Sequence, residues 1–149
     1  MVKFVSLKRK RAERAQSLVE MAISLMAILM LLLGAVEISL ALFQYVSIRD
    51  ASQEGALYGS INPTDTAGIK LHAESVANDV LVIDDSNITV DAPVPCEGLT
   101  GGSPNVITVT ITYPHHIIFP IVGPMLGVNT ITLKASATNT ILQTACDAP

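Results

Sequence analysis

Residues 8–36 read KRKRAERAQSLVEMAISLMAILMLLLGAV, and this stretch decides how the chain is organised. Its basic start meets the small residue Ala15, and no charged residue occurs in residues 21–36. The apolar run continues to Phe43. As a helix it would be about 35 Å long, enough to cross a hydrocarbon core of about 30 Å. The stretch therefore predicts a transmembrane helix over residues 21–43.

The charges of the chain are divided sharply along its length. Residues 1–15 carry a net charge of +5 and residues 16–149 a net charge of −9. A basic flank before an apolar span predicts a cytoplasmic N-terminus and an extracytoplasmic remainder. The basic run could also be interpreted as a nucleic-acid patch. We expect no nucleic-acid partner, because the run abuts the span and no aromatic residues interleave it.

An ordinary secretory signal is the main alternative to a membrane anchor. Such a signal has a shorter apolar region followed by a small-residue cleavage site. Ser39-Leu40-Ala41 and Leu33-Gly34-Ala35 both fit such a site. Against this alternative, the helical pattern does not stop after the apolar block but continues to about Ser60.

Residues 16–60 are predicted to form one helix with two halves of different character. The first half is apolar all round, as expected for a helix embedded in lipid. The second half is amphipathic, with one apolar stripe against which a globular head should pack. That stripe contains Ile48, Ala51, Gly55 and Tyr58. Asn62-Pro63 is predicted to end the helix, because proline lacks a backbone donor.

The remainder of the chain, residues 61–149, predicts a small extracytoplasmic α+β head. Residues 64–82 have apolar positions at helical spacing and predict a second helix, capped by Thr64, Asp65 or Thr66. Three alternating segments predict an antiparallel sheet covered on one side by the helices. These segments are residues 87–91, 106–113 and 130–141. Ile107, Val109, Ile111 and Tyr113, and then Ile131, Leu133, Ala135 and Ala137, are expected to face inward.

The connection between the last two strands, residues 113–127, is unusually apolar for an exposed loop. Two interpretations remain open: it folds back over the core, or it forms a contact surface.

The two cysteines, Cys96 and Cys146, both lie beyond the predicted span. In an oxidising compartment two such thiols usually pair, and we expect a disulfide between them. Its loop of about 50 residues would stabilise the fold by about 4 kcal/mol in the chain-entropy model.

No arrangement of residues predicts catalysis, a cofactor or a metal site. A Ser/His/Asp set, a glycine-rich phosphate loop and a pair of acid–base carboxylates are all lacking from the sequence pattern. His115 and His116 are adjacent in the apolar loop, where no third ligand is near, and the cysteine spacing fits no metal motif. We therefore expect a protein that is not an enzyme.

Three blocks of this sequence resemble the TadE-like family, the pseudopilins of the tight-adherence (Tad) system. They are residues 15–20 (AQSLVE), residues 33–37 (LGAVE) and residues 51–58 (ASQEGALY). The basic leader, small residue, Glu at the fifth mature position and apolar helix together resemble the processing signal of type IV pilin-like subunits. The stretch from Ile107 to Ile141 also looks like the family's C-terminal part. The residue before the cleaved bond is usually Gly in such signals and is Ala15 here.

The resemblance implies insertion in the membrane, cleavage between Ala15 and Gln16 by a prepilin peptidase, and a minor role in pilus assembly. The implied partners are other pilin-like subunits and an inner-membrane assembly platform. In this interpretation Glu20 pairs with the free amine of Gln16 on a neighbouring subunit, because an isolated buried carboxylate costs several kcal/mol. Glu37 either pairs with a partner subunit inside the membrane or lies in the far headgroup layer.

The sequence thus predicts a leader in residues 1–15, a long helix in residues 16–60 and an α+β head in residues 61–149. We expect a single-pass membrane pseudopilin with its head outside the cytoplasm. Two alternatives remain: an uncleaved, membrane-anchored adhesion or binding module, and a small secreted domain released by an ordinary signal peptidase.

Overall fold

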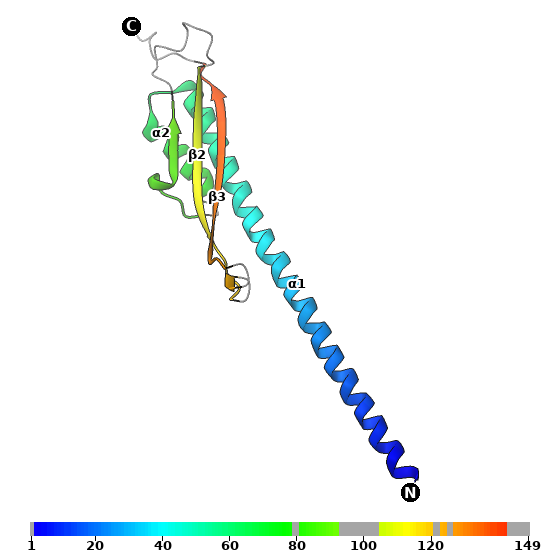
Figure 1. Cartoon of the computed structure of the whole chain (residues 1–149). Coiled ribbons are helices and arrows are strands. Elements are labelled where there is room, and N and C mark those ends of the chain that lie inside the picture. The colour runs from blue at the N-terminus through cyan, green and yellow to red at the C-terminus, as the bar shows by residue number, and fades with distance from the viewer. Residues whose placement is uncertain (1, 79–80, 93–104, 121–122, 125–126, 143–149) are drawn as a thin grey trace, which may run out of the picture. The chain divides into compact units, whose positions relative to one another are not determined.

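The computed structural model describes residues 2–78, 81–92, 105–120, 123–124 and 127–142. Figure 1 shows the elements in chain order: α1 (Val2–Ile61), α2 (Thr66–Ala77), a short 3-10 helix η1 (Asp85–Asn87), β1 (Ile88–Asp91), β2 (Val106–His116) and β3 (Thr130–Thr140). The predicted α+β class is confirmed, with its long apolar N-terminal helix, second helix and three-stranded antiparallel sheet.

The chain divides into two compact units, Met1–Ile38 and Ser39–Pro149. Helix α1 contributes to both, and it begins well before residue 16. The predicted division into residues 1–15, 16–60 and 61–149 concerns processing and topology and stays a prediction.

The core of the second unit lies between the sheet and the two helices. The strands are antiparallel in the order β1-β2-β3, with Ile111 of β2 opposite Ile88 of β1 and Ala135 of β3. Those three residues are buried, as are Ile107 and Val109, and Tyr113 is partly buried against this core, so the predicted inward face of β2 is confirmed. Ile131 of the edge strand β3 is instead 40% exposed, although His115 opposite it on β2 is buried.

Helix α1 ends where proline was expected to stop it. The backbone N–H of Asn62 donates to the carbonyl of Tyr58, and Pro63 then has no N–H to continue the series. Asp65 is the residue that caps α2, since its carboxylate accepts a hydrogen bond from the N–H of Gly68 at 2.9 Å. Such a cap satisfies one of the free donors at a helix start.

Helix α2 is shorter than the predicted range of residues 64–82. It ends at Ala77, and the Asn78 side chain accepts a hydrogen bond from the N–H of Ile83 at 3.1 Å. Asparagine offers the backbone such alternatives to a helix. The buried face of α2 consists of Ile69, Ala73 and Ala77, whereas Val76 is half-exposed.

Strand β2 extends through Pro114 to His116, so the two histidines lie on a strand and not in a loop as predicted. The ladder between β1 and β2 stops at Ile111. Beyond it β2 pairs with β3 alone, and a proline is tolerated there because it needs no partner on the open side.

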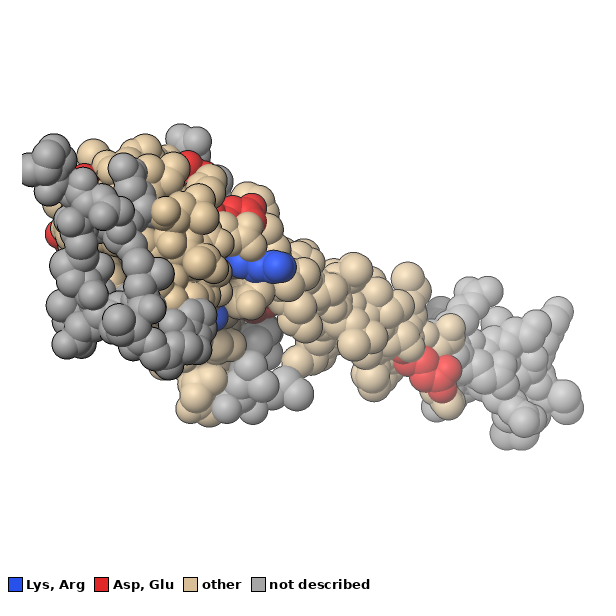
Figure 2. Space-filling view, turned by 90° about the horizontal axis from the view of Figure 1, so that it is seen from above, with Lys and Arg blue, Asp and Glu red and all other residues tan. Residues whose placement is uncertain are grey.

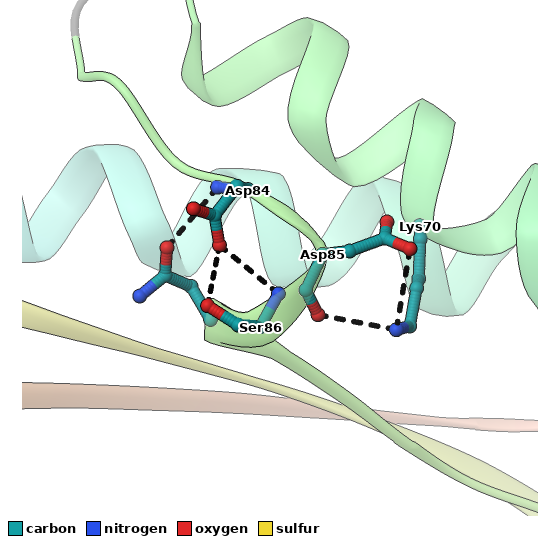
Figure 3. Close-up of polar contacts among 5 residues, drawn as sticks. Lys70, Asp84, Asp85 and Ser86 are labelled. Atoms are coloured by element: carbon teal, nitrogen blue, oxygen red, sulfur yellow. Dashed lines mark hydrogen bonds and ion pairs between the residues drawn. The ribbon is translucent and has the colours of Figure 1, made fainter.

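The turn into β1 is fixed by the polar contacts in Figure 3. Asp84 accepts hydrogen bonds from the N–H and the hydroxyl of Ser86, and Lys70 of α2 donates to the carbonyl of Asp85 at 3.1 Å. These bonds hold the pKa of Asp84 below its ordinary value, chiefly through the Ser86 hydroxyl. The Asn87 side chain donates to the carbonyl of Thr112, which joins this turn to the sheet.

Candidate functional site

The residues of the predicted processing signal are exposed on α1. Ala15, Gln16 and Glu20 are all exposed. The Gln16 side-chain amide donates to Oε1 of Glu20 at 3.2 Å, across one turn of the helix. Residues four apart on a helix face each other, so the spacing itself produces this contact. The carboxylate is therefore hydrogen-bonded within its own chain and still open to a second donor.

Glu20 stands at the start of a surface that is otherwise apolar. Large apolar side chains are exposed along this part of α1, and Leu18, Met21 and Leu31 are each at least 67% exposed. Figure 2 shows the described surface as mainly tan, with few blue or red groups. An ionised carboxylate in such surroundings is costly in lipid unless a donor or a cation reaches it.

Glu37 has a different environment from Glu20, since it is only 5% exposed. Its assembly role stays a prediction.

The block at residues 51–58 packs the head and is not a free surface. Ala51, Ser52 and Ala56 are buried. A Cβ added to Gly55 would lie 3.1 Å from Cβ of Ala73, so the missing side chain lets α1 approach α2 closely. The sequence that resembles a family signature therefore has a structural reason in the packing of α1.

Tyr58, Asp65 and His72 form a cluster that sequence patterns did not predict. The Tyr58 hydroxyl donates to Oδ2 of Asp65 at 2.9 Å, and the Tyr58 and His72 rings stack with centroids 4.1 Å apart. The pKa of Asp65 is lowered, first by the hydrogen bond from Gly68 and then by that from Tyr58. The three residues are seven positions apart, around the turn that joins α1 to α2, and this spacing is the sequence signal that could have indicated the cluster. These contacts connect the start of α2 to the end of α1.

A second contact that the sequence did not predict joins α1 to β2. Nδ1 of His115 lies 2.6 Å from Oε1 of Gln44, and His115 is almost completely buried. The adjacent His116 points to the other face and contacts the hydroxyl of Thr130 at 3.1 Å. The two histidines therefore do not act together.

The predicted disulfide partners, Cys96 and Cys146, lie outside the described residues. Within the described part of the chain, no group of three or more His, Cys, Asp or Glu side chains could hold a metal ion.

One helix in the described ranges is long and apolar enough to cross a membrane, within Ala15–Ile61. Residues 15–57 match the family described as TadE-like protein, which confirms the resemblance predicted from the sequence. A TadE-like match points to a protein associated with the Tad pilus. The comparison with curated proteins and that with solved structures found no match.

Proposed function

We propose that this chain, TadE-like over residues 15–57, is a minor pilin-like subunit of a Tad or type IV pilus-like machine. It is cleaved between Ala15 and Gln16 by a prepilin peptidase and remains in the membrane by α1. Its head lies outside the cytoplasm. There it contacts other pilin-like subunits, while the inner-membrane platform assembles the helices.

The observation that carries this proposal is the position of Glu20 at the mouth of an exposed apolar helix, five residues into the mature chain. After cleavage, the new amine at residue 16 is the cation that a neighbouring carboxylate needs. A paired carboxylate and ammonium offset much of the desolvation cost that each would have alone. The pair also sets the axial distance between neighbouring subunits.

The hydrogen bond between Gln16 and Glu20 allows a sharp test of this pairing. Gln16→Ala removes the side-chain donor but keeps the amine, whereas Glu20→Ala removes the carboxylate itself. We expect Gln16→Ala to assemble nearly as well as wild type. Glu20→Ala should insert and fold but fail to assemble, because a neighbour's ammonium is left without its partner.

Crosslinking to pilin-like partners in native membranes measures assembly directly. Glu74→Ala on α2 is the matched control, since it removes a carboxylate from the head and leaves α1 unchanged. Glu20→Ala protein that crosslinks as wild type does would contradict the pairing. Equal failure of Gln16→Ala and Glu20→Ala would show instead that the side-chain bond within the chain is the important one.

A further inference from the structure

The far end of the β2–β3 hairpin carries an apolar surface that neither the core nor the proposed assembly contacts use. No Asp, Glu, Lys or Arg occurs in residues 114–133. Among the described residues there, Ile118 is 62% exposed and Val128 is 45% exposed. The strands are still paired at this point, because the N–H of Ile117 donates to the carbonyl of Asn129. The surface is therefore built on an ordered hairpin.

Two contacts fix the position of this hairpin along α1. At one end the N–H of Leu142, just after β3, donates to the carbonyl of Ser60. At the other end His115 of β2 contacts Gln44. The hairpin therefore advances toward lower residue numbers of α1, as Figure 1 also shows.

Strand β2 ends at His116, and at the rise of an extended chain the three residues beyond His115 add about 10 Å. That distance equals about six residues of helix at 1.5 Å per residue. Ile118 is therefore placed about six helix residues before Gln44, at the start of the part of α1 that belongs to this unit. The exposed apolar side chains Leu42 and Phe43 belong to the same part of α1.

Along the axis of α1, charged residues begin at the same height on α1 and on the β2–β3 hairpin. Within the second unit, the first charged residue of α1 is Arg49, and the first on the hairpin is Lys134 of β3. The hydroxyl of Ser52 lies 3.4 Å from the carbonyl of Ala135, which places Lys134 close to the α1 turn that carries Arg49. On the Ile118 side of this level, residues 39–48 of α1 and residues 114–133 of the hairpin contain no Asp, Glu, Lys or Arg, and both expose large apolar side chains.

We propose that the end of the β2–β3 hairpin is a second membrane contact, which inserts Ile118 and Val128 into the leaflet on the head's side. The occupant is lipid, because the surface lies on the same side of the His115–Gln44 contact as the exposed apolar side chains Leu42 and Phe43, and it ends where charged residues begin on α1. Apolar side chains next to a membrane span gain by burial in acyl chains. This inference rests on the proposed function only in requiring that α1 crosses the membrane.

The chain contains no tryptophan, so single tryptophans can report the environment of chosen positions. We would place them in the full chain at Ile118→Trp and Val128→Trp, with Leu31→Trp as the control inside the span. Leu71→Trp on α2 is the control in water, since Leu71 is 65% exposed, close to the value for Ile118. Each variant is reconstituted at low protein-to-lipid ratio in phosphatidylcholine vesicles, with or without brominated acyl chains.

We expect brominated lipid to remove most of the emission of Ile118→Trp, Val128→Trp and Leu31→Trp, and acrylamide to quench only Leu71→Trp. Quenching of the Ile118→Trp and Val128→Trp emission by acrylamide would overturn the inference. Protection of both from acrylamide without quenching by brominated lipid would also overturn it, in favour of a protein contact. If Leu31→Trp itself is not quenched by brominated lipid, the crossing of the membrane by α1 is wrong, and the hairpin proposal falls with it.

Discussion

A Cβ added to Gly59 of α1 would stand 2.5 Å from Cδ1 of Ile107 in β2. Ile107 is fully buried, and the same added Cβ would also lie 3.1 Å from Cδ1 of Ile69 in α2. Overpacking of this kind costs about 1–3 kcal/mol, while alanine gains about 1 kcal/mol over glycine in helix propensity. We expect Gly59→Ala to lower the free energy of unfolding of the head by about 1 kcal/mol net.

Denaturant unfolding of the detergent-solubilised chain, followed by circular dichroism, measures this loss. Gly34→Ala is the matched control, because an added Cβ there meets nothing within 4 Å. It should leave the midpoint unchanged or raise it. A Gly59→Ala midpoint at or above that of wild type would mean that the close approach of α1 to β2 does not depend on this glycine.

Tyr58 makes two separable contacts, a hydrogen bond to Asp65 and a stacked ring on His72. We expect Tyr58→Phe to lower the melting temperature slightly, because it removes the bond and keeps the stack. Tyr58→Ala should lower it more, because the ring also packs against the core. Thermal unfolding of both variants and of Asp65→Asn decides this. Equal losses for Tyr58→Phe and Tyr58→Ala would show that the ring contributes nothing.

The lowered pKa of Asp65 predicts how stability depends on pH. An unfolded aspartate has a pKa of about 3.9. Because the folded value is lower, the contribution of Asp65 is fully present above the unfolded pKa and is lost as pH falls through the folded pKa. The pKa of Asp84 is lowered too, so it contributes in the same direction.

Wild type should therefore be more stable than Asp65→Asn at neutral pH, and the difference should shrink below about pH 4. Asp84→Asn should behave in the same way. Unfolding free energies measured from pH 7 to pH 3 test both variants. A difference between Asp65→Asn and wild type that stays constant over this range would contradict the assignment.

The cleavage between Ala15 and Gln16 can be checked by the mass of the membrane-bound protein. We expect loss of residues 1–15, and we expect Ala15→Gly to be processed at least as fast, because glycine is usual before the bond in the family that the sequence resembles. Mature protein that still begins at Met1 would favour an uncleaved anchor. A new N-terminus near Leu42 would favour an ordinary signal peptidase.

Local patterns predicted most of this fold, and long-range contacts account for what they missed. The alternation in β2 correctly placed Val109 and Ile111 in the core, because the period of two directly reports which face is covered. The extension of β2 through Pro114 depends on where β1 stops, which is a property of the partner strand.

In the candidate site, too, the contacts between residues near in sequence could be predicted and the long-range contacts could not. Glu20 and its apolar surroundings are adjacent in sequence, and the spacing alone brings Gln16 to Glu20. His115 and Gln44 are 71 positions apart, so only the packing of the hairpin on α1 brings them together. That contact places the hairpin along the helix, and the two interpretations of the apolar loop stay open.

The disulfide between Cys96 and Cys146 remains a prediction, and the described residues that flank the two cysteines are compatible with it. The N–H of Ile141 donates to the carbonyl of Asn105. One cysteine precedes Asn105 by nine residues and the other follows Ile141 by five. An extended chain spans about 3.3–3.6 Å per residue, so both cysteines are within reach of each other from these fixed points.

Peptide mapping after alkylation without reductant, on protein from its native compartment, tests the bond. We expect one linked peptide pair and a loss of about 4 kcal/mol in the free energy of unfolding on reduction, for a closed loop of about 50 residues. Cys96→Ser and Cys146→Ser should each cost as much as the double variant, because either one opens the same loop. Two thiols that are both freely alkylated would exclude the bond. Unequal losses for the two single variants would show instead that each cysteine has its own packing role.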